Sequence, residues 1–485
     1  MRGWLTEMTV SHKWSWAIFP SDRLALAGFA SWLLLVASPL AAQQFQPLVS
    51  AGPPSRSVQQ ATPAADAGRL TLREAIALAL KNNLSVRVAR TQVDEAAGTE
   101  LRKRSALEPT VTSDAFANLQ DRNLHAIGFT FPGAPIPLTT GTFGTYDFRV
   151  FAKQSVVDRQ AYHTYQSSKR QLDATKMTYQ DTRDLVIRQA AGYYLDAQAA
   201  SAELQAAGAR VETSRALEKL ARDQHAAGLA TAVDVLRAQV QLQRDQQSLL
   251  VARDSYQTSL LVLQRYLGLR PGAPLELAER LEFRTLAPPE PDQAVQAALE
   301  ARADFRALRA QREALGEQLK ASHARYYPKL SINGDYGAFG RNFGEMPGVG
   351  QVQGTVSFTL FDRDRSGEKQ ELSSRLERVE EQIADLQRGI EQDVRKALLD
   401  LASAEQQVSV TQAGVDLAAS ELKLAEDRFR NGVTDNIEVI TAQSSLQSAQ
   451  DDHIAALARH ADARMALARA LGATEQSYER YLGEK

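Results

Sequence analysis

Apolar side chains recur at two different spacings along this chain, and each spacing predicts a different kind of structure. After residue 361, apolar positions fall three and four residues apart, which is the spacing of a coiled-coil seam. They are Leu376, Val379, Ile383, Leu386, Ile390, Val394, Leu398 and Leu401. The proline-free stretch 156–268 also predicts helix, with a turn at 227–229. We expect arms of about seventy residues, roughly 100 Å long, which need partner helices along their sides.

Alternation of apolar and polar residues predicts β-strands in two blocks of the chain. In the first block, Tyr146, Phe148 and Val150 alternate with polar neighbours, and aromatic residues are frequent in both blocks. The expected strands are 109–121 and 142–154, joined by a Gly- and Pro-rich loop, and then 329–340 and 350–361. Such alternation suits a membrane barrel strand, although a half-buried antiparallel sheet would show the same pattern.

The second half of the chain repeats the first, which is the clearest structural signal in the sequence. At an offset of 219 residues, the stretch 87–109 aligns with 306–328, and at an offset of 204 the stretch 220–268 aligns with 424–472. Each repeat is expected to run helix, strand, strand, long helix, turn, long helix, with tips near 228 and 432. The predicted organisation is a first repeat at 70–275, a linker at 276–290, a second repeat at 291–472 and a C-terminal tail at 473–485.

The N-terminus has the order of a secretory signal peptide. Basic residues precede an apolar run from Leu24 to Leu40, and the small residues Ala41 and Ala42 follow it. We predict a signal peptide at 1–42 and a disordered leader at 43–69, which is rich in Pro, Ala, Ser and Gln. The apolar run is also about long enough for a short membrane anchor, and Met8 is an alternative start.

Composition narrows the class of protein. The 485 residues carry a formal net charge of −2, and basic and acidic residues are interleaved, so we expect no nucleic-acid surface. The absence of cysteine excludes disulfides, thiolate chemistry and Cys-ligated zinc. Of the seven histidines, only His453 and His460 share a helical face, without the carboxylates of a metal motif. The glycine-rich stretch 348–354 lacks phosphate-loop spacing. We therefore expect no enzyme, no cofactor and no metal site.

Four strands are too few to close a barrel, because the smallest membrane barrels have about eight. An open sheet edge in lipid would leave backbone groups without hydrogen-bond partners. We therefore expect several chains to share one barrel, with twelve strands from three chains favoured over eight from two. The predicted fold class is mainly α with a membrane β-barrel part. Long coiled-coil helical hairpins and four β-strands per chain would close as a trimeric 12-stranded barrel and an α-helical tunnel.

Three stretches of the sequence resemble the TolC-like outer-membrane efflux proteins. They are 70–83 (LTLREAIALALKNN), 227–235 (AGLATAVDV) and 429–439 (FRNGVTDNIEV). The resemblance covers about 70–472 and implies a homotrimeric outer-membrane channel with a periplasmic helical extension. It also implies that this channel is the exit duct of a tripartite efflux or type I secretion system. The partners would be a periplasmic adaptor (membrane fusion) protein docked at the tips, an inner-membrane pump and outer-membrane lipid.

The two tips carry the candidate site residues. Gly228 and Gly432 are expected to supply the positive φ that a helix reversal needs, which would leave Leu229 and Val433 exposed. The resemblance implies that adaptor docking uses both tip turns. The expected tip and docking residues are Gly228, Leu229, Thr231, Val235, Gly432, Val433 and Thr434.

Asp234 and Glu438 occupy matching places just past the tips, where the family carries acidic residues. In a trimer they would place six carboxylates around one constriction, and such like charges raise each other's pKa and favour cations. This predicts a periplasmic gate. The alternative is helix capping alone, because both Thr231-x-x-Asp234 and Asp435-x-x-Glu438 have capping-box spacing. Both roles are compatible.

The alternative function is a periplasmic coiled-coil scaffold or adaptor without a pore. An adaptor normally carries one hairpin with a small β-domain at its base. Two hairpins and two aromatic-rich strand pairs argue against that alternative.

Overall fold

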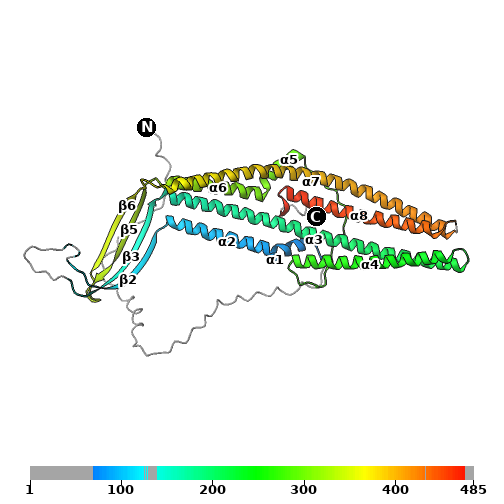
Figure 1. Cartoon of the computed structure of the whole chain (residues 1–485), viewed down its shortest axis with the longest axis horizontal. Coiled ribbons are helices and arrows are strands. Elements are labelled where there is room, and N and C mark those ends of the chain that lie inside the picture. Colours follow the sequence, from blue (N-terminus) through cyan, green and yellow to red (C-terminus); the bar gives the residue numbers. More distant parts are fainter. Residues whose placement is uncertain (1–68, 125, 127, 129–138, 432, 476–485) are drawn as a thin grey trace, which may run out of the picture. The chain divides into compact units, whose positions relative to one another are not determined.

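Long helices, a four-stranded sheet and a two-stranded sheet make up the computed structural model, which describes residues 69–124, 126, 128, 139–431 and 433–475 (Figure 1). The predicted signal peptide, all of the leader except residue 69, and residues 476–485 of the tail lie outside the described residues. Within the described part of the chain, no helix has both the length and the apolar character needed to cross a membrane.

Apart from the short 3-10 helix η1 of the first half, the two halves of the described chain contain the same series of elements. The first half contains β1 (Arg69–Leu70), α1 (Leu72–Asn82), α2 (Leu84–Arg104), η1 (Ser105–Leu107), β2 (Thr110–Gln120), β3 (Phe143–Val157), α3 (Arg159–Ala226) and α4 (Ala232–Tyr266). The second contains β4 (Glu276–Leu277), α5 (Pro291–Ala301), α6 (Ala303–Ala324), β5 (Lys329–Gly340), β6 (Gly348–Ser357), α7 (Asp364–Arg430) and α8 (Asn436–Ala470). Their lengths match closely, because α3 and α7 have 68 and 67 residues and α4 and α8 have 35 each. Only the first arm of each hairpin is therefore close to the expected length of about seventy residues, and the second arm is about half as long.

The expectation of a single helix ahead of each strand pair is wrong. The helix breaks at Asn83 and at Arg302, where ψ is 133° and 123°. Asn83 caps α2 by accepting a hydrogen bond from the Ser85 N–H at 2.8 Å, and such local bonds compete with helix. The C-terminus of α4 docks at the first break, because the Asn82 side chain donates to the Leu267 carbonyl at 2.9 Å. The two breaks lie at matching places in the repeats.

A close approach of a helix end also occurs at the second break. Gly472 follows α8 with φ of 69°, and a Cβ there would lie 2.6 Å from the Arg302 backbone nitrogen. Only glycine combines this backbone conformation with so close an approach. In each repeat, the helix returning from the tip therefore ends against the break between the first two helices.

The four longer strands form one antiparallel sheet in the order β2-β3-β5-β6. Its register places Ala115 beside Phe148, Phe148 beside Ala338, and Ala338 beside Gly348, so one face is largely apolar. The other face carries polar side chains, including the ion pair between Arg149 and Asp147 at 2.8 Å. Figure 1 shows this sheet at one end of the long helices and the hairpin tips at the other.

Strand β6 ends four residues earlier than expected. Its last residue, Ser357, pairs with Lys329, the first residue of β5. Pro328 precedes Lys329 and has no N–H to extend the ladder. The apolar residues Phe358, Leu360 and Phe361 therefore lie beyond the sheet and are exposed.

Three clusters of buried side chains hold the helices together. One joins α1 and α3 to α8 around Tyr194, whose hydroxyl donates to the Leu70 carbonyl at 3.0 Å. The second contains Ile390, Val394 and Leu401, three members of the seam predicted from sequence. The third lies near the tips and joins both hairpins. Each large apolar side chain buried in this way contributes about 1.5–3 kcal/mol.

Candidate functional site at the hairpin tips

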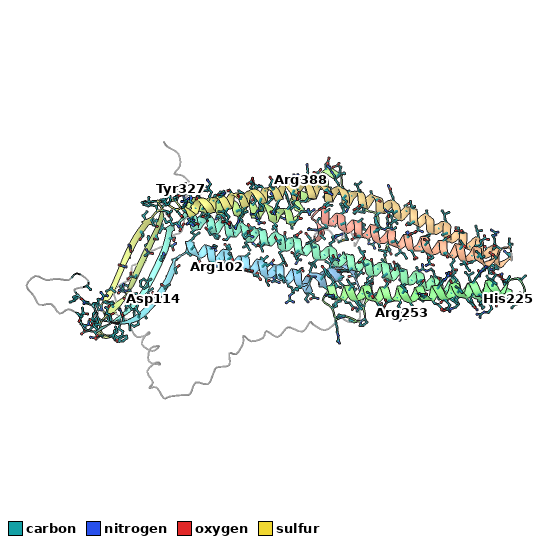
Figure 2. The ribbon with its side chains drawn as sticks, in the orientation of Figure 1. Arg102, Asp114, His225, Arg253, Tyr327 and Arg388 are labelled. Carbon is teal, nitrogen blue, oxygen red and sulfur yellow. The ribbon has the colours of Figure 1, made fainter. Side chains whose placement is uncertain are left out.

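The first tip is a glycine-terminated helix end. Gly228 follows α3 with φ of 74°. Its N–H donates to the His225 carbonyl at 3.0 Å, and the Leu229 N–H donates to the Gln224 carbonyl at 2.9 Å. These two bonds satisfy carbonyl groups that a helix end leaves open. Figure 2 shows His225 at the far end of this hairpin. The turn therefore has the backbone conformation that Gly228 was expected to provide.

Asp234 is a buried cap of α4. Its Oδ2 accepts hydrogen bonds from the Thr231 N–H at 2.9 Å and the Thr231 hydroxyl at 2.6 Å, and its own N–H donates to Thr231 Oγ1 at 3.3 Å. Arg237 lies 3.7 Å from the same carboxylate. The Thr231 hydroxyl above all, aided by its N–H and by Arg237, holds the pKa of Asp234 below its usual value. The capping box expected at this tip is confirmed, and the carboxylate is charged at neutral pH.

The second tip has a related backbone. The Val433 N–H donates to the Arg428 carbonyl at 2.9 Å, across the same span as the Leu229 bond at the first tip. Asp435 caps α8 by accepting from the Ile437 N–H at 3.2 Å. Gly432 lies outside the described residues, so its expected φ stays a prediction.

Glu438 does not form the capping box that its spacing predicts. Its Oε1 accepts from Arg428 at 2.7 Å, and its Oε2 accepts from the Thr434 hydroxyl. A charge-assisted bond to a guanidinium is stronger than a bond to a neutral N–H, so Glu438 turns towards Arg428 and away from the Asp435 N–H. The capping box expected between Asp435 and Glu438 is therefore absent, although Asp435 caps α8, and the two acids have different surroundings.

The other tip residues divide into exposed and packed groups. Leu229 and Val433 are 70% and 67% exposed, so both are accessible to a partner. Thr231 is also exposed. Val235 instead packs against the apolar cluster that joins the hairpins, and the Thr434 hydroxyl is bonded to Glu438. The structure thus places Val235 in the packing between helices.

A groove of about 350 Å³ runs between α4 and α8 near the tips. Its lining is largely apolar and includes two arginines. The lining residues are Val233, Leu236, Arg237, Val240, Gln241, Arg244, Ile437, Ile440 and Thr441. Sequence reasoning missed this groove, although apolar residues three and four apart outside the buried seam were a visible signal.

Buried amide side chains tie the two hairpins together at the tips. The Gln224 side chain of α3 donates to the Phe429 carbonyl of α7 at 3.1 Å. The Asn436 side chain of α8 donates to the Asp234 carbonyl of α4 at 3.0 Å. Both donors are buried, and a buried amide that lost its acceptor would be unfavourable. The tips are therefore joined by polar bonds as well as by apolar contact.

A second polar link lies further from the tips. The Gln443 side chain of α8 donates to the Ser214 hydroxyl of α3 at 2.6 Å, and that hydroxyl donates to Asp245 of α4. Gln241 also donates to Asp245, at 3.2 Å. All four side chains are buried. Sequence reasoning missed these residues, because isolated polar positions on a long helix look solvent-exposed.

The histidines of α8 have structural surroundings. His453 Nδ1 lies 3.1 Å from the Thr411 hydroxyl of α7, and burial lowers the pKa of His453 and of His460. Among the described residues, no group of three or more acidic or histidine side chains could hold a metal ion.

Two helical hairpins on a four-stranded antiparallel sheet define the fold of the TolC-type outer-membrane channels. The solved outer membrane protein VceC of Vibrio cholerae has this fold, with a TM-score of 0.70, 18% identity, and coverage of 83% of this chain and 96% of VceC. The chain belongs to the outer membrane efflux protein family, whose sequence model matches residues 75–269 and 294–473. The resemblance seen in the sequence is thereby confirmed.

Relatives with assigned roles agree with this membership. The probable efflux pump outer membrane protein TtgC of Pseudomonas putida is 25% identical over 400 residues, 78% of each chain. The pyoverdine export outer membrane protein OpmQ of the same species is 25% identical over 317 residues, 63% of this chain and 66% of OpmQ. The chain is an outer-membrane channel protein of the efflux or type I secretion class. The comparisons support a channel and not a scaffold without a pore.

Proposed function

We propose that three copies of this chain assemble into one export duct. The three sheets would close a 12-stranded barrel in the outer membrane, and the hairpins would continue it as a tunnel into the periplasm. Cargo would pass through the lumen, and the chain itself would carry out no catalytic step. The observation that supports this most strongly is a sheet with an apolar face and two unpaired edges.

The edges lie at β2 and β6, each of which pairs on one side only within the described residues. Large apolar side chains on one face, including Val111, Leu119, Tyr336 and Val352, are exposed in the single chain. Soluble proteins rarely leave such a patch open, and open backbone edges do not persist in lipid. A ring of three sheets solves both problems, because β2 of one subunit would pair with β6 of the next.

The exposed tips favour docking of a periplasmic adaptor protein, which would connect the duct to an inner-membrane pump. Leu229 and Val433 would make apolar contact with the adaptor, next to the groove between α4 and α8. Arg237 and Arg244 give that groove a basic rim, so an acidic and apolar adaptor surface would suit it. The efflux and export roles of the relatives support this assignment.

We also propose that Asp234 and Glu438 line the periplasmic end of the duct and favour cations there. Both carboxylates already have partners within one subunit. Thr231 holds the Asp234 carboxylate and Arg428 holds that of Glu438, so a gate would work through carboxylates with fixed positions.

Cysteine cross-linking tests the assembly, because the natural chain has no cysteine. Thr112→Cys in β2 would be combined in turn with Gln351→Cys, Gln353→Cys or Thr355→Cys in β6, since the register between subunits is open and all four residues lie on the polar face of the sheet. We expect at least one combination to give covalent dimers and trimers on a non-reducing gel. A monomer in the purified protein, with no cross-link from any combination, would contradict the proposal.

A matched control uses two residues that pair inside one chain. Lys153 of β3 lies opposite Asn333 of β5, so Lys153→Cys with Asn333→Cys should cross-link without producing higher species. Covalent oligomers from this control would show that the dimers and trimers of the first experiment arise from non-specific contact.

A further inference from the structure

A buried arginine of α8 lacks a partner in the part of the chain that the structure describes. Arg464 is only 4% exposed, and its guanidinium forms no hydrogen bond or ion pair with a described residue. Its Nε atom is completely buried. Removal of a cation from water without a compensating charge is strongly unfavourable. Such a group points to a ligand that supplies the missing acceptors.

A second donor lies one helical turn away. His460 is 1% exposed, and its Nε2 is buried without a hydrogen-bond partner among the described residues. The ring of Phe283, from the segment between β4 and α5, lies 4.9 Å from the imidazole ring. Arg284 follows Phe283 directly and pairs with Glu282 at 3.6 Å. This segment therefore covers the face of α8 that carries both unpartnered groups.

The repeat shows that the fold itself does not require a charge here. Helices α4 and α8 have the same length and align at the offset of 204 residues seen in the sequence. Arg464 then corresponds to Leu260, which packs against the apolar core of the first repeat. His460 corresponds to Tyr256. The second repeat thus has two nitrogen donors where the first has an apolar and an aromatic side chain.

The local charges also fit an anion. Burial and the positive charge of Arg284 lower the pKa of Arg464 to about 10, so it stays protonated at neutral pH. Burial and then the charge of Arg464 lower the pKa of His460, which leaves a neutral ring with one N–H to donate. The nearest acid on α8, Asp462, pairs with Arg188 of α3 on another face of the helix.

We propose that Arg464 and His460 bind a small inorganic oxyanion, such as sulfate or phosphate, beneath the segment that contains Phe283 and Arg284. A guanidinium matches two oxygens of such an ion at once, and the imidazole N–H can donate to a third. Helix α8 packs against α7 and α3 of its own chain, and both donors and Phe283 come from that one chain. The bound ion would fasten the segment joining the two repeats to α8.

Thermal unfolding of the full-length, detergent-extracted protein tests the site. Sodium sulfate would replace sodium gluconate at constant ionic strength, because gluconate is too large for a buried site. We expect a saturable rise in Tm of about 2 °C at tenfold excess over Kd. Arg464→Leu, which places the first repeat's residue at this position, should fold and lose the rise. Without sulfate, this variant should be at least as stable as the natural protein.

Arg253→Gln is the matched control, because Arg253 is an exposed arginine of α4 (Figure 2). It should keep the full response to sulfate. An equal rise in Tm for Arg464→Leu, or no saturable rise in the natural protein, would overturn the proposal. If Arg464→Leu does not fold, crystals of the natural protein grown with selenate give the answer. An anomalous peak beside Arg464 supports the site, and its absence refutes it.

Discussion

Asp184 contributes a stability that decreases as the pH rises, which is the opposite of the usual effect of a carboxylate. This carboxylate lies on α3, is 6% exposed and accepts a hydrogen bond from the Glu475 N–H at 3.1 Å. Burial raises its pKa from 3.8 to about 6, although the Glu475 bond and the charge of Arg469 act in the opposite direction. The folded protein therefore binds this proton more tightly than the unfolded chain does.

The sign of the effect follows from that difference. A group whose pKa is raised by folding contributes stability at low pH and loses it as the pH rises through the folded pKa. For Asp184 the loss falls between pH 3.8 and about pH 6. A shift of about two pKa units corresponds to about 3 kcal/mol. Asp184→Asn removes the charge but keeps an oxygen that can accept from Glu475. We expect it to be up to about 3 kcal/mol more stable than the natural protein at pH 8, with the difference disappearing near pH 4.

Chemical denaturation of the detergent-extracted protein, from pH 4 to pH 8, measures this difference. Asp181→Asn is the control, because Asp181 lies one turn earlier and pairs with Arg469. Loss of a partly buried ion pair should make that variant less stable at pH 8. A pH-independent difference for Asp184→Asn, or a loss of stability at pH 8, would show that burial does not control this carboxylate.

The tips provide three further tests. Gly228→Ala should lower the free energy of unfolding by about 1 kcal/mol, because alanine is strained at a φ of 74°. Gly208→Ala, in the interior of α3, should instead raise the free energy of unfolding by about 0.5–1 kcal/mol. Thermal unfolding of the two variants compares these effects. Thr231→Ala should cost about 1 kcal/mol through the lost cap and speed hydrogen exchange at the start of α4; unchanged exchange would contradict the capping role. Asp234→Asn combined with Glu438→Gln should enlarge small, cation-selective currents in planar bilayers and weaken block by divalent ions. Unchanged conductance and block would refute the gate.

The regular part of the fold was predictable from sequence because it repeats. Alternating residues and the seam around Ile390 and Val394 identified the strands and helices, and the strand ends differ by only a few residues. Strand β6 stops early because its partner begins after Pro328, which is a property of the pairing and not of β6 itself. An isolated segment carries no information about where its neighbour begins.

The breaks at Asn83 and Arg302 were not predictable in the same way. Neither position has a proline or glycine, and at each break a helix end docks that arrives from far away in sequence. The residues of the candidate site also divide into those that the sequence predicted and those that it did not. Gly228 and the capping box of Asp234 follow from local chemistry, whereas Glu438 turns to Arg428 across the tip. The buried links of Gln224 and Asn436 depend on the packing of two hairpins, which local patterns do not reveal.

The docking of each returning helix against a break has a consequence for how this protein can change during evolution. The end of α4 is fixed at Asn82 and the end of α8 at Arg302, while the tips are fixed to each other through Asn436 and Asp234. An insertion in α3 alone would move one tip past the other or pull α4 away from its docking point. A longer variant therefore needs matching insertions in all four arms, in multiples of seven residues that keep the seams aligned. Point substitutions can accumulate singly, but changes of length must be coordinated.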